Sequence, residues 1–326
     1  MGTTADKLNK LLETKANIKQ AIINKGVDVS DDTKFADYPS KIADIVSGDD
    51  PLGPFYKQIT NNGTNYYYLF AYKTISDSSF IEPLDTSNVT NMSYAFNYFS
   101  TSSSLDLSGW NTSKVTSTTN MFMNANIPNL TLFNNIPRVI TSLESFFSNC
   151  KTENIYGIKD WDVSNVKYFG QLFCSCSKLK EIDISGWDTS NGTSFQSSIY
   201  PVIYDCPNLE RIKGAIDMSN NNVRLQYSTT YALTKGCKKL KELRLVNIYK
   251  NTPVKNETGY SLYLQDTQIE DQYLIEIIEN LPDLINDKGL TSTNNLIIML
   301  PPTNTLTAEQ VQVAIDKGWN VANTTY

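Results

Sequence analysis

The chain has 326 residues, of which 40% are hydrophobic, 11% aromatic and 19% charged, and its formal net charge is −6. This hydrophobic content suffices for a folded core and excludes an intrinsically disordered chain. Lysine and arginine are few and unclustered, which argues against a nucleic-acid partner, because such partners are bound through basic patches. The sequence also lacks the roughly 18 consecutive apolar residues of a membrane-spanning helix.

Residues 1–47 are predicted to form a separate helical segment that anchors or oligomerises the protein. Its apolar residues recur at helical spacing, and Gly26 is a natural helix C-cap. Charged residues interrupt the stretch where a secretory signal needs an apolar run, so we expect the chain to be assembled in a cytoplasm. A linker rich in turn-forming residues is predicted at 48–54. The side chains expected to dock this segment are Leu8, Leu11, Leu12, Ile18 and Ile22.

Residues 55–83 contain an aromatic run from Asn65 to Tyr72. We predict capping strands here that cover the open end of the following repeats, with alternate tyrosines facing solvent. A second interpretation remains open, because tyrosine rings and hydroxyls also suit the stacking of sugars. Tyr66 and Tyr68 are therefore candidate ligand-binding residues.

Residues 84–250 contain internal repeats with a period of about 26 residues. Three independent columns of apolar residues keep this period with steps of 25 or 26. Such a repeat predicts a solenoid, because one unit cannot bury its apolar face alone and stacked units can. The columns are Phe96, Phe122, Phe147 and Phe173; Trp110, Ile136, Trp161 and Trp187; and Leu107, Leu132, Ile158 and Ile184.

Two periodicities alternate within each unit. Segments such as Leu105–Leu107, Leu130–Leu132 and Ile182–Ile184 alternate apolar with polar residues, which predicts short strands with one buried face. Apolar residues at i, i+3 and i+7, as in Val89, Met92 and Phe96, predict a short helix. An Asp/Asn-Thr-Ser triplet precedes each such stripe and is expected to cap the helix. The fold class predicted is therefore an α/β solenoid.

The order Leu-x-Leu-Ser-Gly-Trp-Asn/Asp-Thr-Ser-x-Val, followed by Met-Phe or Leu-Phe and then Cys-x-x-Leu, resembles the BspA-like class of leucine-rich repeats over about residues 84–245. This resemblance implies a leucine-rich-repeat-like stack of short strands and short helices, preceded here by the small helical anchor. Residues 251–326 are predicted to be a last repeat and cap, with a strand at Leu296–Leu300, a helix capped by Thr307 and a final strand near Trp319.

No catalytic or metal site is expected. The chain has no histidine, which excludes Ser-His-Asp and His-metal chemistry, and no cofactor is predicted. Cys150, Cys176, Cys206 and Cys237 recur once per repeat and are interpreted as small buried residues. Asp106 and Asp183 lie three units apart, which is too far for a catalytic carboxylate pair.

Two functions from different classes follow. The segment before Gly48 resembles the leading part of bacteriophage tail and fibre proteins, which implies a virion protein (tail fibre, head fibre or decoration protein) whose solenoid binds a protein or glycan on a bacterial surface. The alternative is a bacterial surface adhesin or protein-interaction module, which the repeat class also serves. Partners expected of the virion protein are other tail or capsid proteins and copies of the chain. Ligand contact is expected on the strand face or nearby loops, at Tyr66, Tyr68, Asp106, Tyr156, Asp183, Arg211 and Arg244.

Overall fold

The structure is a computed structural model, and it describes residues 12, 14–20, 22, 69–197, 200–222, 232–255, 257, 260–291 and 295–323. The chain divides into two compact units, residues 1–63 and 64–326. In the first unit, residues 14–20 are helical, as predicted. Within the described residues, no helix has the length and apolar character needed to cross a membrane.

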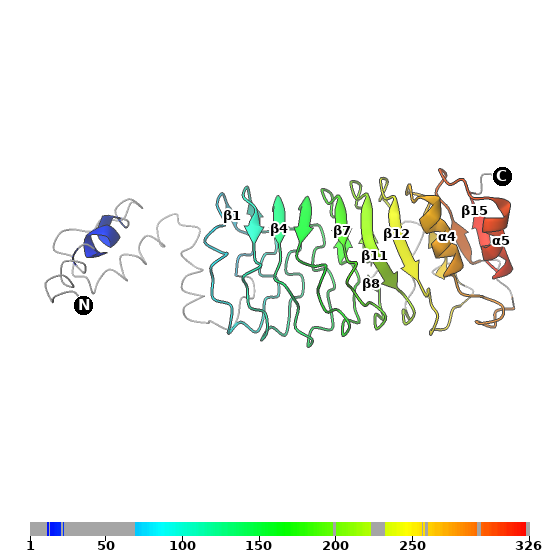
Figure 1. Cartoon of the computed structure of the whole chain (residues 1–326), viewed down its shortest axis with the longest axis horizontal. Helices are drawn as coiled ribbons and strands as arrows, with labels where there is room; N and C mark the ends of the chain where they lie inside the picture. Colours follow the sequence, from blue (N-terminus) through cyan, green and yellow to red (C-terminus); the bar gives the residue numbers. More distant parts are fainter. Residues whose placement is uncertain are drawn as a thin grey trace. The chain divides into compact units, whose positions relative to one another are not determined.

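The second unit is a solenoid of stacked coils, with short strands of successive coils side by side along its length (Figure 1). The predicted strands at Leu105, Leu130 and Ile182 are confirmed, and each of these three side chains is buried. Strands of neighbouring coils pair in parallel, with Leu105 opposite Leu130 and Leu130 opposite Ile155. The main sheets are β3-β4-β5 (Leu105–Asp106, Asn129–Thr131, Asn154–Tyr156) and β7-β11-β12 (Glu181–Asp183, Arg211–Asp217, Glu242–Val246).

Smaller strands complete the coils. In the repeats they are β1 (Thr74–Ile75), β2 (Ser100–Thr101), β6 (Phe173–Cys174), β8 (Gln196–Ser197), β9 (Tyr200–Pro201) and β10 (Ile203–Tyr204). The pairs β1-β2 and β6-β10 are parallel, whereas β8-β9 is an antiparallel pair.

The helices predicted within the repeats are wrong. Residues 93–98, and the equivalent residues of later coils, form consecutive tight turns in which Ala95 N–H donates to Met92 C=O and Asn97 N–H donates to Tyr94 C=O. Alternate N–H groups donate to the next coil, as Phe96 does to Met121 C=O. A helix is about 10 Å wide and uses its N–H groups internally, so it would prevent this side of the coil from pairing at the roughly 4.8 Å spacing of strands.

The turn segments require left-handed backbone angles at fixed positions. Tyr98, Asn124, Asn149 and Ser175 occupy the same position in successive coils, with φ between 55° and 61°. At each of them the N–H donates to a carbonyl of the next coil at 2.7–2.9 Å. We call this position the left-handed column.

The Asp/Asn-Thr-Ser triplets cap turns and not helices. Asp85 Oδ1 accepts from Ser87 N–H at 2.9 Å, two residues on. Thr86 accepts from the N–H of Asn111 in the next coil at 2.7 Å and donates to its carbonyl at 3.1 Å. The triplet therefore shapes one coil and ties it to the next.

The described part of the aromatic run also differs from prediction. Residues 69–72 form turns instead of a strand, and Phe70 is buried and stacks on Phe96 with ring centroids 5.0 Å apart. Tyr72 has φ 60°, as the left-handed column requires. This segment is therefore shaped like the turn side of a repeat.

The core is a ladder of stacked side chains, as the repeat columns predicted. Phe96, Phe122, Phe147 and Phe173 stack in order, with centroids 4.9–5.9 Å apart and nearly parallel rings. Trp161 Nε1 donates to the Phe133 carbonyl of the preceding coil at 2.8 Å. The repeating cysteines are buried with free thiols, as predicted for small core residues.

The end of the unit is a three-stranded sheet with two helices. It contains β13 (Leu262–Tyr263), α4 (Asp271–Glu279), β14 (Ile297–Met299), α5 (Ala308–Asp316) and β15 (Asn320–Ala322). The predicted strands and Thr307-capped helix are confirmed: Thr307 accepts from Gln310 N–H, and Gln310 accepts from Thr307 N–H at 2.8 Å. Helix α4 was not predicted.

One core position carries a polar group without a partner. Thr118 is 2% exposed, and its hydroxyl has no hydrogen-bond partner among the described residues. The equivalent residues of other coils are Met92, Leu143 and Phe169. We expect Thr118→Val to raise the free energy of unfolding by about 1 kcal/mol, because it removes an unsatisfied buried hydroxyl without changing the volume.

The matched control is Thr86→Val. Thr86 is also 2% exposed, but its hydroxyl makes two hydrogen bonds to Asn111, so the same replacement should lower the free energy of unfolding by about 1–3 kcal/mol. Urea titrations followed by tryptophan fluorescence measure both. A loss of stability in Thr118→Val would contradict the placement of that hydroxyl.

Candidate functional site

The outer side of the paired strands is a regular surface that the repeats create. We call it the strand face and define it by two columns that flank the buried residues. The first column has Asp106, Thr131, Tyr156, Asp183, Lys213 and Arg244; the second has Asn129, Asn154, Glu181, Arg211 and Glu242. Backbone pairing places Thr131 opposite both Asp106 and Tyr156, and Asp183 opposite Lys213. Five of the predicted ligand-binding residues therefore share one face.

Apart from Asp106, the first half of the strand face is uncharged. Asn154 Nδ2 donates to Asn129 Oδ1 at 2.8 Å, and Asn129 Nδ2 donates to Ser104 at 3.1 Å. Tyr156 stands beside this amide ladder with 53% of its surface exposed. A half-exposed tyrosine next to fixed amides suits binding, because its ring supplies contact area and its hydroxyl a polar group.

The second half is ionic. Lys213 Nζ lies 2.6 Å from Glu181, and Arg211 lies 3.8 Å from Glu242. Each of these cations is 42–52% exposed, so solvent screens the pairs and each adds little to the stability of the fold. A partner that binds these charged groups would therefore break ion pairs that contribute little to the stability of the fold.

Arg244 links strand β12 of the repeats to helix α4 at the end of the unit. Its Nε and Nη2 donate to both carboxylate oxygens of Glu276 on α4 at 2.7–3.1 Å. This bidentate pair holds the pKa of Arg244 above its usual range, first through the hydrogen bonds from Glu276. A ligand would have to compete with Glu276 for this guanidinium. No sequence signal indicated Glu276 as the partner of Arg244, since α4 was not predicted.

The carboxylates of Asp106 and Asp183 each accept a hydrogen bond from a backbone N–H group. Asp106 Oδ1 accepts from Ser108 N–H at 2.8 Å, and Asp183 Oδ1 accepts from Ser185 N–H at 3.0 Å. Each aspartate thus fixes the turn that follows its strand. Their role in ligand binding stays a prediction.

The structure does not describe all of the predicted residues. Tyr66, Tyr68, Leu8 and Leu11 are outside the described residues, as is the linker at 48–54. In the first unit, Leu12 is 55% exposed, Ile18 is half-buried and Ile22 is buried. Their docking role stays a prediction.

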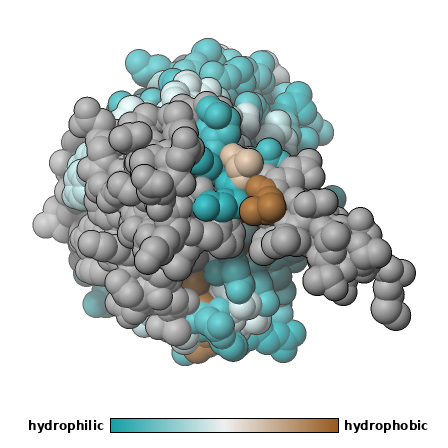
Figure 2. Space-filling view, turned by 90° about the vertical axis from the view of Figure 1, so that its left-hand side faces the viewer, coloured by the Kyte–Doolittle hydropathy of each residue, from teal (hydrophilic) through white to brown (hydrophobic). Residues whose placement is uncertain are grey.

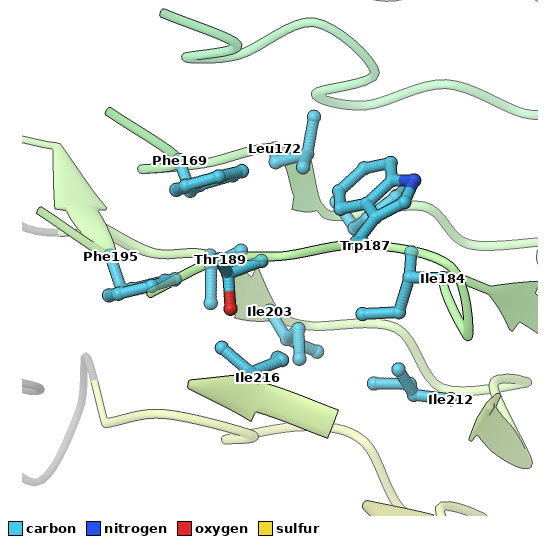
Figure 3. Close-up of a pocket in the computed structure, with 11 residues that line it drawn as sticks. Phe169, Leu172, Ile184, Trp187, Thr189, Phe195, Ile203, Ile212 and Ile216 are labelled. Atoms are coloured by element: carbon cyan, nitrogen blue, oxygen red, sulfur yellow. The ribbon is translucent and has the colours of Figure 1, made fainter. Parts of the chain in front are cut away.

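An interior cavity lies where the repeats lengthen, between Trp187 and Ile212 (Figure 3). Apart from Thr189, its lining is apolar, and the free space amounts to about 10 Å³. That is no more than one water molecule needs. We interpret it as a packing gap caused by the longer coils, and not as a ligand site.

A shallow groove of about 430 Å³ lies beside the start of α4, lined by Lys241, Gln268, Ile269, Glu270, Asp271 and Thr303. Its carboxylates are engaged in hydrogen bonds within the protein: Asp271 accepts from Thr305 N–H at 3.1 Å, and Glu270 accepts from Gln272 at 2.9 Å.

Burial raises the pKa of Cys150 and Cys174 to about 11, which disfavours their nucleophilic thiolate forms. Among the described residues, no group of His, Cys, Asp and Glu could hold a metal ion.

Three turn-capping aspartates should make the fold sensitive to acid. The hydroxyl of Ser164 donates to Asp162 at 2.6 Å and lowers the pKa of that carboxyl below its usual range, with a further contribution from Arg138. The N–H of Ser87 does the same for Asp85. At Asp183 burial raises the pKa, but hydrogen bonds from Ser185 outweigh it and the net shift is downward.

A carboxyl whose pKa is lower in the folded state contributes stability above its unfolded pKa, near 4, and loses it as the pH falls. We therefore expect the urea midpoint to drop as the pH falls from about 4 to 2. A triple variant with Asn at 85, 162 and 183 keeps an accepting Oδ1 but cannot titrate, so its midpoint should depend less on pH in this range. Equal slopes for the two proteins would contradict this origin.

One family model matches the chain, over residues 56–152 and 141–202, and its description is "Mycoplasma protein of unknown function, DUF285". No curated protein and no solved structure matched. The two matched ranges overlap and cover the first repeats, including residues before Leu84. The match therefore supports the repeat solenoid, and its description names Mycoplasma and no bacteriophage. Over residues 56–202, the chain is similar to a Mycoplasma family of unknown function.

Proposed function

We propose that the protein is a binding module displayed on a bacterial surface, and that the strand face contacts its partner. The observation that carries this proposal is the strand face itself, where Tyr156, amides and accessible ions line the outer side of two sheets, while the interior cavity has no room for a ligand. Stacked repeats commonly use such extended surfaces for binding. The similarity to a Mycoplasma family supports the surface module over the virion protein.

The experiment compares two identical substitutions on different sides of the coil. Thr131→Arg places a long charged side chain beside Tyr156, whereas Thr116→Arg places it at an exposed position on the turn side, where Thr116 donates to the Thr90 carbonyl. We expect the labelled full chain to bind intact bacterial or animal cells. Thr131→Arg should weaken binding at least tenfold, and Thr116→Arg should leave it nearly unchanged. Equal binding by the two variants would contradict the proposal.

Display is tested separately by labelling intact cells that express the chain with a membrane-impermeant biotin reagent. Labelling before lysis is the expected result. Labelling that appears only after lysis would contradict surface display while leaving the strand-face test intact.

A virion protein is the second candidate; it rests on the resemblance of the segment before Gly48, in which residues 14–20 are helical, to bacteriophage tail and fibre proteins. Deletion of residues 1–47 should then abolish incorporation into particles while the solenoid stays folded. Normal incorporation of the shortened chain would exclude this candidate.

A further inference from the structure

Four cysteines form a column through the interior of the repeats. Cys150, Cys176, Cys206 and Cys237 lie in successive coils, and each is 0–1% exposed. The described surface that Figure 2 shows is mostly hydrophilic, whereas these thiols belong to the buried core. The fold thus aligns cysteines that are 26 to 31 residues apart in the sequence.

Backbone pairing places Cys206 opposite Cys237. Strands β11 and β12 pair Arg211 with Glu242, which is 31 residues further on. The residue before Cys206 donates its N–H to the carbonyl of Lys235 at 2.7 Å. The two cysteines lie between these contacts and are also 31 residues apart, so they occupy equivalent positions in adjacent coils. Their thiols are hydrogen-bonded to each other.

The spacing of these two residues suits a disulfide. Neighbouring strands lie about 4.8 Å apart, within the roughly 4.4–6.8 Å that separates the Cα atoms of a disulfide. The Cβ atoms must approach to about 3.8 Å, so bond formation draws the two coils slightly together. The pairing of these coils is already irregular between Arg211 and Ala215, so a local adjustment interrupts no continuous ladder.

Cys176 lies on the other side of Cys206 and is the competing partner. The Cys176 thiol donates to the Phe147 carbonyl at 3.1 Å, and the Cys206 thiol donates to the Phe173 carbonyl at 2.8 Å. A bond between Cys176 and Cys206 would remove both donors from buried carbonyls, which is unfavourable. The Cys237 thiol is hydrogen-bonded to Cys206 itself, so a bond between these two residues removes only one.

The length of the enclosed coil also favours this pair. The step from Cys206 to Cys237 is 31 residues, whereas the period of the first coils is about 26. A cross-link that closes a longer loop removes more conformational entropy from the unfolded chain. This pair therefore encloses a coil whose ordering costs more than that of a regular repeat.

We propose that Cys206 and Cys237 form a reversible disulfide between adjacent coils under oxidising conditions. Two S–H bonds break and one S–S bond forms, through a mixed disulfide with a low-molecular-weight disulfide such as oxidised glutathione. That reagent takes up the two electrons and two protons and leaves as two thiols. The inference concerns the stability of the solenoid and does not depend on which partner the strand face binds.

Refolding of the full chain from urea in a buffer of oxidised and reduced glutathione tests the proposal, because an oxidant reaches these buried thiols only while the coil is open. Of the five cysteines, the two that are joined should be lost to maleimide labelling after denaturation. Mass spectrometry of the digest should find Cys206 linked to Cys237. The oxidised protein should unfold at a higher urea concentration than the same protein in dithiothreitol.

Cys206→Ser and Cys237→Ser are the decisive variants, because serine keeps a hydrogen-bond donor and cannot form the bond. Their urea midpoints should not depend on dithiothreitol. The matched control is Cys174→Ser, since Cys174 lies opposite Tyr204; this variant should keep the cross-link. The proposal is overturned if all five thiols stay free, if Cys206 is linked to Cys176 instead, or if oxidation raises the midpoint of Cys206→Ser as much as that of the wild type.

Discussion

Replacement of Phe122 by alanine should lower the free energy of unfolding by about 3–5 kcal/mol. Phe122 is fully buried and lies between Phe96 and Phe147, with ring centroids 4.9 Å and 5.9 Å away. Truncation removes contacts with both neighbouring coils at once and leaves a cavity that stacked coils cannot close. Urea unfolding of the full chain, followed by circular dichroism, measures the loss.

Phe122→Leu is the matched control, because it keeps an apolar side chain in the ladder. We expect a smaller loss, about 1–2 kcal/mol. If the two variants lost the same amount, or if Phe122→Ala lost less than about 1 kcal/mol, the stacked core described here would be contradicted.

Gly157→Ala should lower the free energy of unfolding by about 2–4 kcal/mol, through left-handed strain and overpacking. Gly157 has φ +86°, and an added Cβ would lie 2.5 Å from the carbonyl oxygen of Leu132 in the preceding coil. That oxygen belongs to the backbone and cannot rotate away. The shift needed would disturb the neighbouring hydrogen bond from Leu132 N–H to Tyr156 C=O.

Gly109→Ala is the control for the glycine change itself. A Cβ at Gly109 would meet nothing within 4 Å, so its stability should stay within about 1 kcal/mol of the wild type, with a gain more expected than a loss. Thermal unfolding of both variants is the measurement. A Gly157→Ala protein as stable as Gly109→Ala would show that neighbouring coils are farther apart at this point.

The repeat period, the buried strand residues and the phenylalanine ladder could be predicted from the sequence, because each depends on spacing alone. The turn side could not. Apolar residues at i, i+3 and i+7, as in Val89, Met92 and Phe96, are compatible with a helix and with consecutive turns. The turns form instead of a helix because the backbone of each coil must pair with the neighbouring coils on the turn side as well as on the strand side. A sign was present in the Asn124 and Asn149 column, since asparagine tolerates left-handed angles.

The strand face was partly predictable. The alternation of apolar and polar residues indicated that Asp106, Tyr156 and Asp183 point outward, and the structure brings them onto one face. The pairing of Arg244 with Glu276 was not predictable, because it depends on where α4 lies. The irregular strand pairing around Gly214 was also not predicted: the φ of +100° at Gly214 accompanies a register shift in the pairing of β11 with β12.

The outer strand face is the surface proposed to bind a partner. A photo-cross-linking amino acid at position 156 of the full chain, irradiated on intact cells, tests this directly, with the same amino acid at position 168 as the comparison. We predict one discrete cross-linked partner from position 156 and none of that mass from position 168. The same partner from both positions, or none from position 156, would contradict the assignment of binding to this face.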